Sequence, residues 1–402
     1  MKRVSFILFF SIFFYPISIF INSSVSFAAT EFVSTIQESG GDYNSPFPWE
    51  EAIKTDLTVS STKVYSASST TGTVSDGATV TGSVSTTTKA KVLHNSTINS
   101  QVLVQDLRKI ITGTSTFSTS SNIVTGTGTL YTTELSTGDY IWLESSQTWQ
   151  QIASIASSTE LTLSATSTIA GSGQTSARGK SNFQASEQLQ VDGSNYIVIS
   201  NTGDSAIATA KIDGSWTSPD TAAAGSTIDG WTTTSTNYIK IYTTTAARHN
   251  GKWDTSKYRI QRTSGNTGIT IFENYVRIEG LQIGFTNNST AGRRGIHVST
   301  IDAGGSRIYI DNNIVRALDL ASSTASHSGI QVNDTDATVI ARNNIVYDFI
   351  IAGVGGNGYV VSAGLLYLYN NTAYNNYNGI SRTGGGDPFI KNNISYNNTD
   401  NY

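Results

Sequence analysis

The feature that most constrains the fold is an Asn-Asn doublet that recurs in the last third of the 402-residue chain. Each doublet lies between two short stretches in which apolar and polar residues alternate. Counted at the second Asn, the spacing shortens along the chain from 31 to 27 and then to 22 residues. The segment VRIEGLQIGF aligns 32 residues ahead of the first doublet, with Leu281 in the second position. The second asparagines are Asn313, Asn344, Asn371 and Asn393.

A second mark accompanies the doublets, a Gly-Ile pair that begins at Gly295, Gly329 and Gly379, with Gly353-Val354 as a weaker copy. One turn of a parallel β-helix places each strand about 4.8 Å from its equivalent in the preceding coil. Equivalent asparagines then stack and can donate to and accept from each other, and glycine permits a tight corner. The pattern therefore predicts a parallel β-helix whose loops shorten toward the C-terminus.

Two other structures were weighed for this repeat. The period falls within the range of leucine-rich repeats, but the LxxLxL spacing is missing. An Asn-rich disordered tail would not keep Ile, Val and Tyr at fixed offsets from each doublet. The repeat resembles that of right-handed parallel β-helix proteins of the pectate-lyase-like group over residues 270–402. Because the last coil ends without a closing cap, we expect the β-helix to be incomplete at its C-terminus.

Composition supports an all-β fold for the whole chain. Charged residues make up only 13%, about half of what is usual in soluble domains, and Ser, Thr, Asn and Gly replace them. Disorder is disfavoured because the net charge is only −4 and there are 19 Tyr, 15 Phe and 6 Trp. Without a basic stripe, a nucleic acid partner is not expected. The chain has no cysteine, which excludes disulfides, thiolate zinc sites and cysteine nucleophiles.

The first 28 residues are expected to be a signal peptide. Lys2 and Arg3 precede an apolar run from Val4 to Ile21, and small residues at Ser26 and Ala28 suit cleavage after Ala28. A retained membrane anchor is the alternative, because the run is long enough to approach the spanning limit. We expect the protein to be secreted or displayed at the cell surface, with no membrane span in the mature chain.

The region between the signal peptide and the repeat divides into three parts. Residues 29–111 are an N-terminal β-rich region, 112–180 an inserted small β module, and 181–269 a β-rich region that leads into an aromatic cap of the solenoid. The module resembles small β modules of phage tail and bacterial surface proteins. Thr114–Phe117 and Lys180–Phe183 look like two versions of one joint, so the module is expected to interrupt another unit.

The resemblance to the pectate-lyase-like group directs attention to carboxylates that bind calcium. Many members cleave acidic polysaccharides with carboxylate-bound Ca²⁺ and an arginine base. Asp334 and Asp336 come nearest to such a pair and could ligate Ca²⁺. They also fit an ordinary Asx turn between two strands, which is the interpretation we favour.

A basic cluster is the candidate for substrate binding. Arg293, Arg294 and His297 lie together in GRRGIHV and could contact an anion such as a uronate. His327 lies about one coil further on, but its offset from the glycine differs, so the two histidines should not occupy equivalent rungs. Solvated loop residues are the simpler interpretation.

Two functional hypotheses follow. The first is a secreted or surface β-helix protein without catalysis that binds glycans, acts in adhesion or is structural; its partner would be a polysaccharide or a cell-surface glycan. The alternative is a carbohydrate-active enzyme, a polysaccharide lyase or glycoside hydrolase, which rests on fold analogy alone. The sequence designates no catalytic residues, and calcium is the only cofactor it suggests.

Overall fold

The computed structural model describes residues 29–144, 147–179, 181–221, 227–263, 267–286, 292–299, 306–320, 324–350 and 354–402. The predicted signal peptide lies outside these residues. The structure is nearly all β, with 52% strand and 3% helix. Among the described segments, none of the helices has the length and hydrophobicity that crossing a bilayer requires.

Parallel strands form three columns, here called faces A, B and C, and successive strands enter the columns in turn. Face A contains β1 (Thr30–Ile36), β15 (Ala206–Ile212), β17 (Ile239–Thr243), β20 (Val276–Glu279), β23 (Ser306–Asp311) and β30 (Asp387–Lys391). Face B contains β18 (Ile260–Thr263), β21 (Gln282–Thr286), β24 (Ile314–Asp319), β26 (Ile345–Tyr347), β28 (Thr372–Tyr374) and β31 (Ile394–Tyr396). Face C contains β16 (Thr227–Ile228), β19 (Ile269–Ile271), β22 (Arg294–Ser299) and β29 (Asn378–Arg382).

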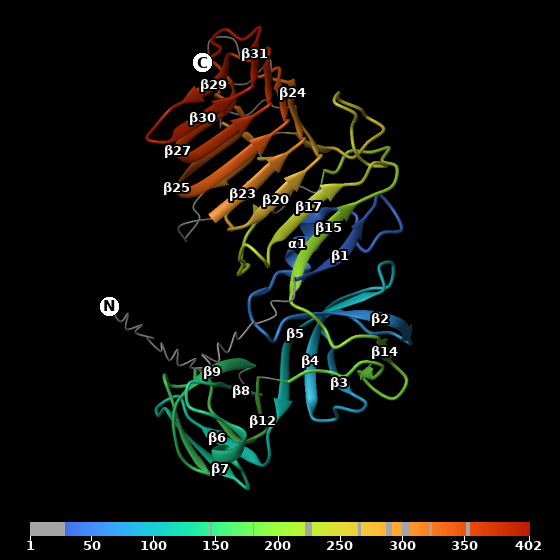
Figure 1. Cartoon of the computed structure of the whole chain (residues 1–402), viewed down its shortest axis with the longest axis vertical. Helices are drawn as coiled ribbons and strands as arrows, with labels where there is room; N and C mark the ends of the chain where they lie inside the picture. The colour runs from blue at the N-terminus through green and yellow to red at the C-terminus, as the bar shows by residue number, and fades with distance from the viewer. Residues whose placement is uncertain are drawn as a thin grey trace, which may run out of the picture.

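Two long strands belong to two faces each. The first parts of β25 (Ser328–Arg342) and β27 (Asn357–Tyr369) pair within face C, and their last parts pair within face A. Figure 1 shows the strands of face A side by side, from β1 in blue to β30 in red. This connectivity is compatible with a parallel β-helix.

The predicted column of asparagines is confirmed. The side-chain Oδ1 of Asn344 accepts from the backbone N of Asn313 at 2.9 Å and from its Nδ2 at 3.0 Å. Asn371 and Asn393 repeat both bonds in the next two coils. Each Nδ2 also donates to a backbone carbonyl, as from Asn344 to Ile310 at 2.7 Å. Asn313 and Asn344 are fully buried, so a polar row inside the solenoid is satisfied coil by coil.

The first asparagine of each doublet has a different structural role. Asn312, Asn343, Asn370 and Asn392 all have left-handed backbone conformations, with φ between 56° and 58°. Asparagine is among the few L-residues that adopt this conformation readily, and Gly280 takes the place in the earlier coil with φ 79°. The backbone N of Leu281 donates to Asn313 Oδ1 at 2.9 Å, which confirms the alignment of the coil without a doublet.

A second asparagine ladder lies at the other end of the face B strands. The backbone N of Phe349 donates to Asn376 Oδ1 at 3.1 Å, and that of Asn376 donates to Asn398 Oδ1 at 2.8 Å. Asn376 and Asn398 belong to the second Asn-Asn pairs in YNNTAYNN and KNNISYNN. Short face B strands are therefore held by side-chain bonds at both ends.

The glycine mark also forms a column, but with one correction. A Cβ on Gly295 would lie 2.4 Å from the carbonyl of Gly329, and one on Gly329 would lie 2.8 Å from that of Gly358. Gly358-Tyr359 is therefore the third copy, because Tyr359 pairs with Ile330 and Ile380. The assignment to Gly353-Val354 was wrong, and Gly353 itself lies outside the described residues.

The parallel sheets begin much earlier than residue 270, since β1, β15, β17 and β18 already belong to them. The early coils carry no Asn-Asn doublet, so the repeat did not predict them. The aromatic stretch expected to form a cap supplies core residues of these coils, including Trp231 and Tyr258. Helix α1 (Pro46–Ile53) packs against this core, with Trp49 fully buried and its ring 6.0 Å from that of Trp231.

The remaining strands are antiparallel. A closed barrel consists of β2 (Lys63–Thr71), β3 (Thr79–Gly82), β4 (Thr88–Ser96), β5 (Gln101–Ile110), β13 (Gln188–Gln190) and β14 (Tyr196–Ile199). Between β5 and β13 the chain forms a module with its own core, made of β6 (Thr114–Phe117), β7 (Ile123–Thr127), α2 (Tyr131–Glu134), β8 (Tyr140–Leu143), β9 (Thr148–Ser157), β10 (Glu160–Leu163), β11 (Gly171–Gln174) and β12 (Ser176–Arg178). The module thus interrupts the barrel in sequence, whereas β15, which follows, belongs to face A.

A partly buried charge network connects the barrel to the parallel sheet. His94 of β4 lies 3.5 Å from Asp42, which follows β1, and 3.0 Å from Asp76 of the barrel. Burial acts to lower the pKa of His94, but the two carboxylates outweigh it and raise the pKa to about 9. The ring of Tyr43 packs on the imidazole at 4.9 Å.

We predict that Asn344→Ala destabilises the protein by about 3 kcal/mol, because the buried backbone N of Asn313 and carbonyl of Ile310 lose the side chain that they bond. The matched control is Asn343→Gly, at the exposed neighbouring position with φ 56°, which should cost less than about 1 kcal/mol. Chemical denaturation measures both free energies of unfolding. An equal loss of unfolding free energy in both variants would contradict a larger contribution of the inward asparagine.

We predict a loss of stability at alkaline pH that depends on His94. The pKa of His94 is raised in the folded state, so its contribution is complete below the unfolded pKa of about 6.5 and is lost as pH rises through about 9. His94→Gln should remove this part of the pH dependence. Melting temperatures between pH 6 and 10 test it, and parallel curves for both proteins would refute it.

Candidate functional site

Face A presents a row of aromatic and cationic side chains to solvent. Alternation along a strand points every second residue outward, and the parallel register sets these residues in line across the coils. Figure 1 shows the strands that carry the row. From β17 to β30 the row runs Lys240, Arg277, Tyr309, Ile340, Tyr367 and Phe389.

The N-terminal part of the row surrounds a small hollow. The guanidinium of Arg277 lies 3.7 Å from the ring centroid of Tyr238 and 5.5 Å from that of Tyr309. Together with Arg307 and Tyr275, these residues line a cavity of about 100 Å³. Tyr275 is held in the turn before β20 by a left-handed backbone, φ 50°. The hollow therefore combines aromatic rings with two guanidinium groups.

The two arginines of the hollow differ from the neighbouring cations Lys240 and Arg248. Lys240 is paired with Glu31 at 2.9 Å, and Arg248 with Glu279 at 2.9 Å. Within the part of the chain that the structure describes, neither Arg277 nor Arg307 has a carboxylate within ion-pair distance. The hollow thus carries two cationic groups side by side, which a negatively charged ligand group would pair.

The C-terminal part of the row is purely aromatic or apolar. The rings of Tyr367 and Phe389 stack at 4.6 Å between centroids with an interplanar angle of 10°. Tyr369 lies beside them, 6.1 Å from Tyr367. Phe389 is 47% exposed, so an amphipathic ligand can reach this aromatic group from solvent.

Face B carries a comparable row whose charge is compensated. Arg316, Tyr347, Tyr374 and Tyr396 are in register, and the rings of Tyr374 and Tyr396 stack at 6.1 Å. Arg316 forms an ion pair with Asp348 at 3.3 Å. Aromatic rows therefore accompany the repeat on two faces, and only that of face A has unpaired arginines among the described residues.

The predicted substrate-binding residues lie together at the start of β22 on face C. The backbone N of Arg293 donates to Nδ1 of His327 in the next coil at 2.8 Å. Arg294 Nε donates to Gln331 Oε1 at 2.7 Å. His297 pairs in register with Gln331, so the two histidines occupy different rungs, as the sequence indicated.

Both histidines of this cluster are held neutral. Burial, with a contribution from Arg294, lowers the pKa of His297 to about 4. Burial and the neighbouring arginines also lower the pKa of His327 to about 4. Among the described residues, Arg293 Nε is buried without a hydrogen-bond partner. The cluster has the charge to contact an anion, and substrate binding by Arg293, Arg294 and His297 stays a prediction.

The two aspartates predicted to ligate calcium lie in the link between the two parts of β25. Asp334 Oδ1 accepts from the backbone N of Asp336 at 2.8 Å and from that of Ala337 at 3.1 Å, the bonds of an Asx turn. Asp336 is exposed. Over the described residues, no three or more His, Asp or Glu side chains are grouped as a metal site would need. A calcium role for this pair stays a prediction.

The outward rows were missed from sequence because the repeat was read for its inward residues. The signal was available in the same alignment, since Arg277, Tyr309 and Tyr367 lie at one offset from the buried positions. No family model matches the chain, and no curated protein is similar to it in sequence. Any statement about its function thus depends on the chemistry of these surfaces.

We predict that the face C histidines destabilise the protein in mild acid. The pKa of His297 is lowered in the folded state. The stability of the protein with a neutral His297 is therefore complete above about pH 6.5, the pKa in the unfolded chain, and is lost as the pH falls toward 4. His297→Gln should reduce the drop in unfolding free energy between pH 7.5 and 4.5 by about 1 to 2 kcal/mol. Urea titrations at both pH values measure it; an unchanged drop in the variant would count against it.

Proposed function

We propose that this chain is a non-catalytic surface protein that binds acidic glycans along face A. We also propose that its parallel sheets form a right-handed β-helix of the pectate-lyase-like kind, as the Asn-Asn repeat suggests. The predicted signal peptide supports export to a compartment where such glycans occur. An adhesive or structural role follows naturally from a rigid stack of coils with ligand contacts on one side.

The observation that carries the proposal is the hollow around Arg277. Its guanidinium lies between the rings of Tyr238 and Tyr309, and Arg307 lines the same cavity. The apolar face of a pyranose ring packs on a tyrosine ring, and a uronate carboxylate accepts two parallel bonds from an arginine. A sugar acid needs both groups side by side, and this hollow supplies them.

The repeat of the fold suits a polymer better than a single sugar. Neighbouring coils are about 4.8 Å apart, so the contacts of the row repeat at a short and regular distance along the stack. A chain laid across the strands would pass from the cationic hollow to Tyr367 and Phe389 at the other end of the row. Its carboxylates would meet the arginines and its ring faces would meet the aromatic group.

We predict that Tyr309→Ala and Arg277→Gln each weaken binding to polygalacturonate or alginate by about tenfold, because each removes one half of the hollow. Tyr374→Ala on face B is the matched control and should bind like the unchanged protein. Affinity electrophoresis and calorimetry with acidic and neutral polysaccharides measure the effect. Absence of binding to every acidic polymer, or equal weakening by Tyr374→Ala, would overturn the proposal.

The same incubations separate binding from catalysis. With and without Ca²⁺, the polymers should be recovered intact, without new reducing ends or unsaturated products. Appearance of either product would show that the chain acts on its ligand and would refute a purely binding function.

A further inference from the structure

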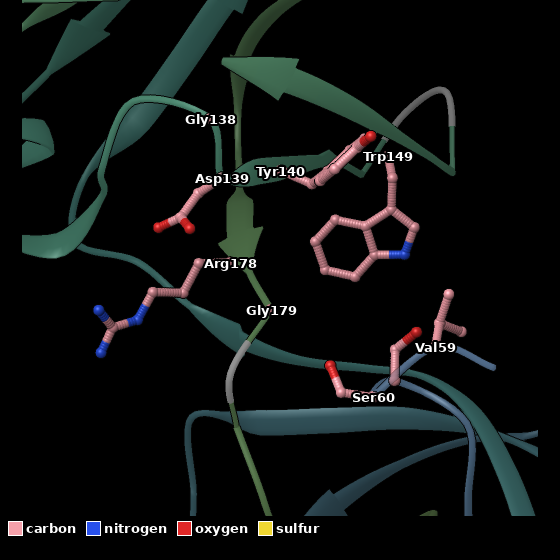
Figure 2. Close-up of a pocket in the computed structure, with 9 residues that line it drawn as sticks. Val59, Ser60, Gly138, Asp139, Tyr140, Trp149, Arg178 and Gly179 are labelled. Carbon is pink, nitrogen blue, oxygen red and sulfur yellow. The ribbon is translucent and has the colours of Figure 1, made fainter. Parts of the chain in front are cut away.

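A second candidate site lies far from the outward row of face A, between the inserted module and the barrel. A cavity of about 450 Å³ opens there, within the size range of small-molecule sites. Figure 2 shows Trp149 and Tyr140 on one side, Val59 and Ser60 on another, and Arg178 projecting from the end of β12. Its lining thus comes from both units.

The aromatic wall of this cavity is held rigidly. The ring of Trp149 meets Trp142 edge to face, with centroids 5.3 Å apart. Trp142 is itself fixed, because its Nε1 donates to Glu144 at 2.9 Å and the guanidinium of Arg108 lies 4.7 Å from its ring. Arg108 also pairs with Glu144 at 3.3 Å. A preorganised ring loses little entropy when a ligand packs on it.

The two units that form the cavity are joined by a continuous sheet. β12 pairs with β8 of the module on one side and with β5 of the barrel on the other, so Arg178 lies opposite both Ile141 and Lys109. Arg178 Nη1 donates to the carbonyl of Glu134 at 2.7 Å, which leaves other N–H groups of its fork for a ligand. The cavity therefore lies where hydrogen-bonded strands join the module to the barrel.

The lining selects the class of ligand. A flat aromatic wall favours a molecule with an apolar face, and polar groups around it favour hydroxyls. Among the described lining residues, Asp139 and Arg178 bring one charge of each sign, which favours a neutral ligand over an anion or a cation. We propose that this cavity binds one neutral pyranose ring, stacked on Trp149 with its hydroxyl groups directed to Arg178, Asp139 and Ser60. This site does not depend on the proposal for face A.

Saturation-transfer NMR with glucose, galactose, mannose and N-acetylglucosamine tests the site on the whole mature chain. At least one sugar should give a saturable signal, weakened about tenfold by Trp149→Ala and also reduced by Tyr140→Ala. Tyr140 is 52% exposed, so its removal should leave the fold intact even if Trp149→Ala does not. Tyr309→Ala on face A should change nothing.

Three outcomes would overturn the assignment. One is that none of the four sugars gives a saturable signal. Another is that a signal persists at full strength in Tyr140→Ala and Trp149→Ala, and the third is that it disappears in Tyr309→Ala. The last result would move the neutral sugar to face A, whereas failure of the face A experiments with acidic polymers would leave this site unaffected.

Discussion

The hydrogen bonds between stacked asparagine side chains are the constraint on which the C-terminal coils depend. Each inward Asn bonds to the backbone and side chain of its neighbour and to a carbonyl of the adjoining strand. A shift by one residue would bury an unsatisfied amide and break the bonds of two coils at once. The strands therefore stay in line even though the coils shorten from 32 to 22 residues.

This register has a consequence at the surface. Because the inward residues are fixed in columns, the residues between them are fixed in columns on the outside. On face A that places Arg277 against Tyr309, and Tyr367 against Phe389, although more than twenty residues separate each pair in sequence. Arg277 and Arg307 near Tyr238 have no carboxylate within ion-pair distance among the described residues, whereas Arg316 of face B pairs with Asp348. The proposed ligand surface thus follows from the same repeat that stabilises the core.

Much of the parallel fold could be predicted from sequence because the Asn ladder uses one residue type at one offset. The column from Asn313 to Asn393 and the alignment of Leu281 were predicted correctly. The earlier coils could not be found in this way, since apolar residues such as Ile241 and Ile278 satisfy the same register without a distinctive motif. The candidate site was missed because a sequence shows which residue types are outward but not which charges lack partners.

The most direct test of this account is the exchange of side-chain amide protons, measured by NMR on the mature chain. The Nδ2 protons of Asn344 and Asn371 donate inside the solenoid, whereas those of Asn343 and Asn370 lie at the exposed corners. The account predicts slow exchange with solvent deuterium for the first pair and fast exchange for the second. Fast exchange at all four positions would contradict the ladder, and with it the register that builds the outer face.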